Sequence, residues 1–293
     1  MARAIFRLRL PDGSVRLASG TTDGGPSDLL APELTVESLL LAGVEAVAQA
    51  AATATGTRIP ADSILLAPID AQEVWGAGVT YERSRVARME EATEPSIYDR
   101  VYEATRPEVF FKTAGWRVRG PAEAITVRAD SDWNAPEPEF ALVLTPSLEI
   151  AGYSVGNDVS SREIEGENPL YLPQAKTYDG SCAIGPGIVP VDEAPLPIGI
   201  HLEVFRDGAT VADGSTSTDR LHRTFDDLLE HLGRALSFPH GVFLLTGTGI
   251  VAGSEFSLSA GDVCRIEMDG LGVLENPVVS VGRPAVATQA STA

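Results

Sequence analysis

The chain has very few cysteines, and the two it has form no metal-binding or disulfide pattern. Cys182 and Cys264 are the only two among 293 residues. Neither has a second cysteine or a histidine at the short spacing typical of a zinc site. The sequence therefore indicates neither a zinc centre nor a disulfide framework, and we expect both thiols to be inert.

Basic residues are also scarce relative to acidic ones. The sequence holds 22 Lys and Arg against 41 Asp and Glu, which gives a formal net charge of −19. Nucleic acid and anionic membrane surfaces would repel such a chain, so neither is expected as a partner. A small anionic ligand would have to meet a local positive site.

Long hydrophobic runs are absent as well. No stretch approaches the length of a membrane-spanning helix, and Met1-Ala2-Arg3 is not followed by the continuous apolar core of a signal peptide. We therefore expect a soluble, cytoplasmic protein. Hydrophobic residues make up 44% of the chain, which is ordinary for a folded protein with a sizeable core.

The chain opens with a mixture of β and α patterns. Residues 6–10 and 15–17 alternate on either side of a turn at 11–14, which predicts a hairpin. Thr35 can cap a helix whose apolar stripe runs to Ala51 and stops near Gly56. Residues 64–66 predict a short buried strand. We expect a small N-terminal α+β domain over residues 1–70.

Short strands broken by Gly and Pro follow, and they predict a mainly β domain over residues 71–284. Strands are expected at 140–144, 150–155, 200–205, 242–245 and 263–268. A charged helix after Tyr81, ended by Pro95, would form a surface segment or a lid, and a second helix over 218–236 would pack on the sheet. Residues 285–293 are expected to be a disordered tail.

Three carboxylates carry the strongest chemical signal. Pro138 holds Glu137 in an extended conformation, so Glu139, two residues on, faces the same side of a strand that is apolar on both faces. Two like charges directed into the interior call for a cation. Asp158, where the strand at 150–155 breaks, can supply a third oxygen ligand. Such a set of ligands suits Mg²⁺ or Mn²⁺. A Glu-x-Glu motif without the third carboxylate would instead be interpreted as the solvent-exposed start of a strand.

A glycine-rich run over residues 247–253 invites a dinucleotide-binding interpretation. Residues 254–258 alternate like a strand, however, where that fingerprint requires a helix. A loop that presents Thr248 and backbone N–H groups to a substrate carboxylate fits the pattern better.

At the carboxylates the sequence resembles the fumarylacetoacetate hydrolase superfamily, whose metal site joins a Glu-x-Glu to an Asp in a Gly-Asn-Asp-x-x-x-Arg segment. The matches include residues 137–139, 156–162, 174–179, 185–186, 246–248, 261–263, 270–272 and 276–278. The resemblance runs from about Gly76 to Arg283. It implies an α+β, mainly β fold of the mixed β-sandwich roll type, Mg²⁺ (with Mn²⁺ or Ca²⁺ as alternatives) at Glu137, Glu139 and Asp158, a small anionic 2-keto acid substrate, and a homodimer or homotetramer.

One departure from the family pattern narrows the choice of reaction that the chain can catalyse. Hydrolases of this superfamily commonly carry a His and a Glu on the lid to activate water, and the matching positions here are Ser84 and Ala87. Without that pair, hydrolytic C–C cleavage lacks its usual base. An acylpyruvate or fumarylpyruvate hydrolase that recruits Glu90 or Glu91 stays open as the alternative, as does a binding protein without turnover.

Three segments resemble instead the branch of 2-keto-3-deoxy-sugar-acid dehydratases. They are the lid, residues 110–112 and residues 165–176. That branch dehydrates 2-keto-3-deoxy-arabinonate or xylonate to 2,5-dioxopentanoate. The resemblance implies Lys176, Ser84 and Glu108 as catalytic residues and Arg83, Ser84, Phe111, Lys112, Lys176 and Thr248 as substrate contacts. Without the resemblance, these lysines would be read as surface or strand-end charges, and Arg83 and Ser84 as first-turn helix residues.

Overall fold

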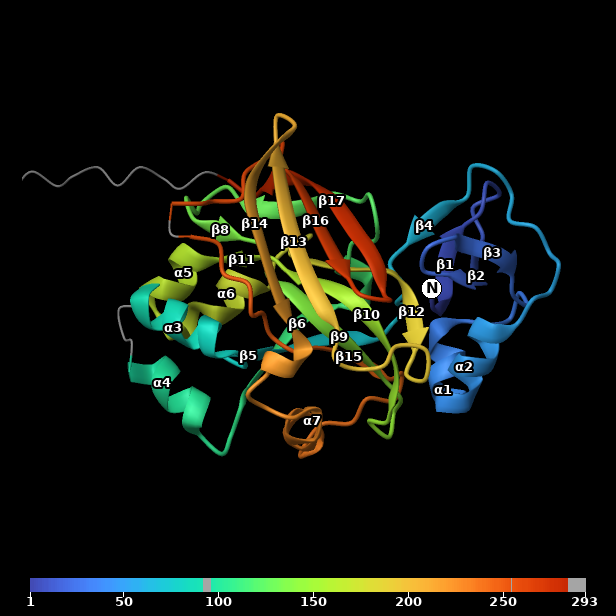
Figure 1. Ribbon diagram of the computed structural model, residues 1–293, viewed down its shortest axis with the longest axis horizontal. Helices are drawn as coiled ribbons and strands as arrows, with labels where there is room; N and C mark the ends of the chain where they lie inside the picture. Colours follow the sequence, from blue (N-terminus) through green and yellow to red (C-terminus); the bar gives the residue numbers. More distant parts are fainter. Residues whose placement is uncertain (92–95, 254, 284–293) are drawn as a thin grey trace, which may run out of the picture.

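The computed structural model describes residues 1–91, 96–253 and 255–283, and it is built mainly of strands (Figure 1). The predicted tail at 285–293 and the expected helix end at Pro95 lie outside these residues. No helix in the described part of the chain is long and apolar enough to cross a membrane. The predicted α+β, mainly β fold class is confirmed.

A large mixed sheet forms the centre of the molecule. Its order is β3 (Gly25–Leu29), β2 (Val15–Thr21), β1 (Arg3–Arg9), β12 (Cys182–Pro190), β10 (Ile150–Asp158), β9 (Pro138–Leu144), β15 (Val242–Leu245), β5 (Glu73–Gly78) and β6 (Glu108–Ala114), with β4 (Ile64–Leu66) paired to β1. The predicted hairpin is therefore β1–β2. It continues the central sheet through a pairing of Ile5 with Ile188, so the division of the chain near residue 70 stays a prediction.

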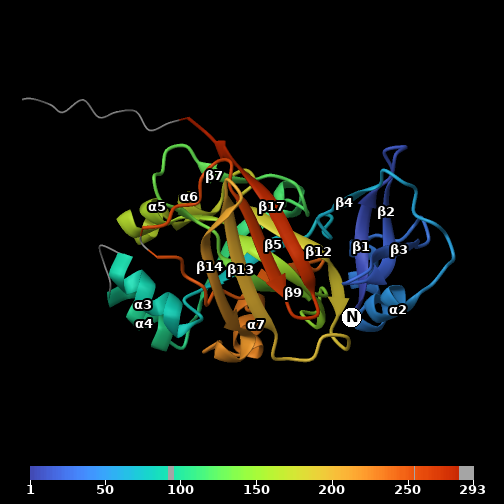
Figure 2. The ribbon, with the colours of Figure 1, turned by 45° about the horizontal axis from the view of Figure 1, so that its top comes forward.

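A second sheet packs against the first. It has the order β14 (Ala209–Ser217), β13 (Gly199–Arg206), β16 (Val263–Met268), β17 (Gly272–Val281) and β7 (Ile125–Arg128), and a small pair joins β8 (Asn134–Ala135) to β11 (Ser160–Ser161). Figure 2 shows β13 and β17 crossing in front of the central sheet. All five strands predicted between residues 140 and 268 are present.

Strand β9 is apolar on both faces, as the sequence predicts. Phe140, Leu142 and Leu144 belong to the core shared with the second sheet, whereas Ala141 and Val143 belong to the core beneath the N-terminal helices. Burying both faces fixes the register of this strand strongly, because a slip of one residue would exchange the two sets. The strand that carries the carboxylates is thus the most constrained part of the sheet.

The helices are shorter than the sequence patterns suggest. They are α1 (Val36–Ala42), α2 (Val44–Ala52), α3 (Glu82–Glu91), α4 (Ser96–Glu103), α5 (Arg162–Glu167), α6 (Leu172–Lys176) and α7 (Phe225–Gly233), with 3₁₀ turns at Gly115–Arg117, Pro169–Tyr171 and Thr218–Arg220. Thr35 caps α1 as predicted. The expected single helix is broken at Gly43, whose φ of 100° an α-helix cannot contain.

Two further expectations need correction. The helix predicted over 218–236 begins only at Phe225, after a 3₁₀ turn and a Thr224 cap, and ends at Gly233. Residues 255–258 form no strand although they alternate. Alternation alone cannot supply the neighbouring strand that pairing requires. Helices α3 to α6 gather at the end of the molecule opposite the N-terminal strands (Figures 1 and 2), and α3, α5 and α6 contribute residues to the site.

Candidate active site

The predicted metal ligands converge. Glu137 directly precedes β9, Glu139 lies within it, and Asp158 ends the neighbouring strand β10. One carboxylate oxygen from each lies within 4.8 Å of the others, and all three side chains are buried. Asn157 contributes to the arrangement because its Oδ1 accepts the backbone N–H of Glu137 at 3.1 Å. Two adjacent strands therefore bring together a ligand set that is separated in sequence.

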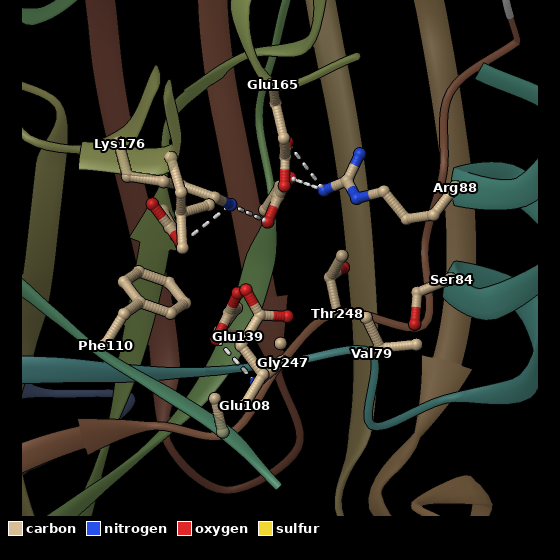
Figure 3. A pocket seen from close by; sticks show the side chains of 15 residues that line it. Val79, Ser84, Arg88, Glu108, Phe110, Glu139, Glu165, Lys176, Gly247 and Thr248 are labelled. Atoms are coloured by element: carbon tan, nitrogen blue, oxygen red, sulfur yellow. Dashed lines mark hydrogen bonds and ion pairs between the residues drawn. The ribbon is translucent and has the colours of Figure 1, made fainter. Parts of the chain in front are cut away.

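Several cations surround these carboxylates. Glu137 is paired with Arg88 at 2.8 Å, Arg162 at 3.0 Å and Lys176 at 2.7 Å. Lys176 also reaches Asp158 Oδ2 at 3.0 Å and donates to Ser160 Oγ at 2.7 Å. Figure 3 shows Arg88 and Lys176 approaching the cluster from opposite sides. The carboxylates are thus compensated by the chain's own side chains.

The same contacts set the protonation of the carboxyl groups. Burial raises the pKa of Glu137, but Lys176 and Arg88 outweigh it and bring that pKa to about 2. Burial, together with Asp158 and Glu137, holds the pKa of Glu139 well above its usual range. Burial lowers the pKa of Lys176, but Asp158 and Glu137 outweigh burial and raise it well above its usual value. Glu139 therefore holds a proton more readily than an ordinary glutamic acid does.

The residues present fit a divalent cation. The three ligands are oxygen donors, which hard cations such as Mg²⁺ prefer. Glu139 Oε2 accepts the backbone N–H of Gly247 at 2.6 Å, which orients the carboxyl group as outer hydrogen bonds commonly orient metal ligands. Asp158 Oδ1 is buried and accepts no hydrogen bond among the described residues, with the Lys112 ammonium as its ion-pair partner. These observations support the predicted site at Glu137, Glu139 and Asp158.

The predicted substrate contact Lys112 lies behind the pocket instead of facing it. Its side chain is 0% exposed, forms an ion pair with Asp158 Oδ1 and donates to the carbonyl oxygen of Val159 at 3.0 Å. A β-bulge explains the difference. Val74 pairs with Thr113 and Trp75 with Phe111, which leaves Lys112 as the extra residue of β6, and a bulge redirects a side chain. Lys112 therefore supports a metal ligand.

The other residues of β6 divide between its two faces. Glu108 and Phe110 line the pocket, whereas the predicted contact Phe111 does not. Phe111 is 38% exposed and meets Trp75 edge-on, with ring centroids 5.9 Å apart. Alternation along a strand places Glu108 and Phe110 on one face and Phe111 on the other. The structure therefore places Phe110 in the pocket, and the predicted contact Phe111 outside it.

Helix α3 contributes Ser84 and Arg88 to the pocket, four residues apart on one helix face. Ser84 is buried, and its Oγ donates to the carbonyl oxygen of Tyr81 at 2.8 Å. Arg83 points away from that face, is exposed and lines a separate hollow. The structure thus places Ser84 with the metal ligands and Arg83 apart from them.

The glycine-rich loop lines the pocket as expected, but one of its backbone N–H groups already donates a hydrogen bond within the protein. Thr248 lines the pocket and its Oγ1 accepts the backbone N–H of Ile250 at 3.2 Å. The Gly247 N–H, expected to face a substrate carboxylate, is bonded to Glu139. At this position the loop orients a metal ligand.

Sequence reasoning missed Arg88 and Glu165. Arg88 bridges Glu137 and Glu165, the latter at 3.1 Å, and both Arg88 and Glu165 line the pocket. Helical spacing from Ser84 could have indicated Arg88. No local signal indicates Glu165, because its partner is far away in the sequence.

A buried carboxylate triad beside a lysine, open to a pocket, is the arrangement of a metal-dependent enzyme. The family described as fumarylacetoacetate (FAA) hydrolase C-terminal matches residues 73–279. The chain belongs to the fumarylacetoacetate hydrolase family.

Within this family, the chain is similar in sequence and structure to particular dehydratases. A probable 2-keto-3-deoxyxylonate dehydratase of Haloferax volcanii is 49% identical over 216 residues, covering 73% of this chain and 74% of the relative. The 2-dehydro-3-deoxy-D-arabinonate dehydratase of Saccharolobus solfataricus is 44% identical over 217 residues, covering 72% and 73%. A solved structure of 2-keto-3-deoxy-D-arabinonate dehydratase with magnesium and 2,5-dioxopentanoate superposes with a TM-score of 0.82 at 33% identity, covering 96% of this chain and 100% of that one.

Proposed function

We propose that this chain is a Mg²⁺-dependent hydro-lyase that dehydrates a 2-keto-3-deoxy sugar acid, a pentonate of the arabinonate or xylonate type, to 2,5-dioxopentanoate. The observation that carries the proposal is one pocket in which the carboxylate triad, Lys176, Glu108 and Ser84 meet. Relatives 44% and 49% identical bear the names of such dehydratases.

The reaction removes one water and then tautomerises the product, with the carbon skeleton unchanged. C3 loses a proton, the C4 hydroxyl leaves, a proton moves from C5 to C3, and the resulting enol becomes the aldehyde. Mg²⁺ held by Glu137, Glu139 and Asp158 would supply a Lewis acid for the keto-acid end of the substrate. This chemistry needs a base that accepts the C3 proton, a group that holds the developing negative charge, and an acid for the leaving hydroxyl.

The pocket offers side chains for each of these tasks. The Lys176 ammonium lies against two of the carboxylates and 5.6 Å from the centre of the Phe110 ring, so it can hold charge on the C2 oxygen. Glu108 is the proposed acid for the C4 hydroxyl. Ser84 and Thr248 would bind the polyol end and the carboxylate. The alternative role for Lys176, base at C3, is tested below.

The proposed function is tested by product identification. Purified chain with Mg²⁺ should convert at least one stereoisomer of 2-keto-3-deoxypentonate to a semialdehyde. No turnover of any stereoisomer would contradict the proposal, and faster cleavage of acetylpyruvate would establish the hydrolase instead. Glu90, a base considered for that hydrolase, is exposed on α3 and does not line the pocket.

The cytoplasmic location of the chain and its assembly as a homodimer or homotetramer stay predictions.

Glu108 should give the reaction a characteristic pH dependence. Burial, the nearby Glu165 and Glu137 together raise the pKa of Glu108 to about 7, against the opposing charges of Lys176 and Arg88. An acid works only while protonated, so kcat should fall as pH rises through this pKa. Bound Mg²⁺ adds positive charge and moves the midpoint lower, so it should lie no higher than about 7.

Glu108→Gln keeps the size of the side chain but cannot release a proton. It should reduce kcat roughly 10²-fold or more and remove the decline with rising pH. A wild-type kcat that instead increases through this range would make Glu108 a base and contradict its assignment as the acid.

A further inference from the structure

Two glycines of β5 lie directly opposite the two pocket residues of β6. Gly76 pairs with Phe110 and Gly78 with Glu108 in the antiparallel register. Residues paired in this way have their side chains on the same face of the sheet, with Cβ atoms about 5 Å apart. Each glycine thus leaves free the space that its partner's side chain could enter.

Both side chains do enter that space. A Cβ placed on Gly78 would lie 2.1 Å from Glu108 Oε2 and 2.6 Å from its Cδ, and a Cβ on Gly76 would lie 2.6 Å from Phe110 Cζ. Strand side chains ordinarily stand roughly perpendicular to the sheet. Glu108 and Phe110 instead lie across β5, with their far ends over the glycine Cα atoms.

The backbone does not account for these glycines. Twelve glycines of the described residues have positive φ, and neither Gly76 nor Gly78 is among them. Glycine in a strand interior weakens the strand and often marks a close approach. The close approach here is made by the side chains of Glu108 and Phe110.

We infer that Gly76 and Gly78 are positioning residues, which form a shelf across β5 on which Phe110 and Glu108 lie so that both reach the pocket. Gly78 itself lines the pocket beside Glu108. Through this shelf a strand that places no reactive side chain in the pocket determines the position of the proposed acid. The inference rests on the proposed function in assuming a catalytic role for Glu108.

Gly78→Ala is the direct test. The methyl group meets the far end of a flexible side chain, so the Glu108 carboxyl group can swing aside and the fold should survive. With the 2-keto-3-deoxypentonate that wild type converts, kcat should fall roughly 10- to 100-fold, and its decline with rising pH should shift or vanish. Mg²⁺ affinity should be unchanged because the ligands lie on β9 and β10. Gly24→Ala is the matched control, because an added Cβ there also meets only the end of a side chain, Thr21 Oγ1, and Gly24 does not line the pocket.

The double variant Gly78→Ala/Glu108→Ala decides whether the effect passes through Glu108. Once the Glu108 side chain is gone, Gly78→Ala should cost no further activity, because coupled residues are not additive. If Gly78→Ala lowers the melting temperature, Glu108→Ala should restore it. Wild-type kinetics in Gly78→Ala, or an equal loss in the Glu108→Ala background, would overturn the inference. Full activity of Glu108→Ala alone would contradict the proposed role of Glu108.

Discussion

Glu139→Gln should abolish Mg²⁺-dependent turnover while leaving the chain folded. The amide retains the shape of the side chain and an oxygen that can accept the Gly247 N–H, but it removes an anionic ligand. The raised pKa of Glu139 favours its protonated, uncharged form, and the neutral amide resembles that form. Thermal unfolding in chelator should therefore match that of wild type.

Calorimetry with Mg²⁺ and a rate assay measure the expected loss. We expect Mg²⁺ affinity to fall by roughly 10²-fold or more, because a charged ligand contributes more than the outer partners that already give 10- to 100-fold effects. Glu90→Gln, on the exposed face of α3, is the matched control and should behave as wild type. A wild-type rate that survives chelation, or normal Mg²⁺ binding by Glu139→Gln, would show that the metal site lies elsewhere.

Lys176→Met should cause a loss of activity of similar size for a different reason. The substitution leaves Glu137 paired with Arg88 and Arg162, and it leaves Asp158 paired with Lys112. No buried carboxylate loses its last cation, so the fold should persist. The rate should fall roughly 10²- to 10⁴-fold because the charge that develops on substrate loses its ammonium partner.

Two measurements separate the possible roles of Lys176. Mg²⁺ should bind Lys176→Met at least as well as wild type, because a cation that competes for Glu137 and Asp158 is gone. Exchange of the C3 protons with deuterated solvent should persist weakly if Lys176 only holds charge, and should disappear if Lys176 is the base. A kcat within twofold of wild type would contradict both roles.

The carboxylates that the structure brings together could be picked out in the sequence because their signal is local. Pro138 fixes the geometry of Glu137, and the apolar run after Glu139 indicates a strand buried on both faces. The strands could be predicted for the same reason, since alternation over a few residues shows which face is buried. Only the pairing of β9 with β10, which joins Asp158 to the other two, required the resemblance or the structure.

The cations and the helix boundaries could not be predicted from local patterns. Arg88 and Glu137 are separated by 49 positions, so no local sequence pattern indicates that they form an ion pair. The bulge that turns Lys112 inward depends on its register with β5. A positive φ at Gly43 breaks a helix that the apolar stripe alone would continue. In each case a partner distant in sequence, or a single backbone angle, decided the outcome.

The separation of the site into two groups of elements has a consequence for how such enzymes diversify. The proposed metal ligands lie within β9 and β10 or directly before β9, and both strands are hydrogen-bonded on both sides and buried in the central sheet. Ser84 belongs to α3, which lies at the end of the molecule opposite the N-terminal strands (Figure 1). Natural selection can therefore replace residues of α3, and with them the accepted substrate, while the inherited metal chemistry in the sheet stays constant.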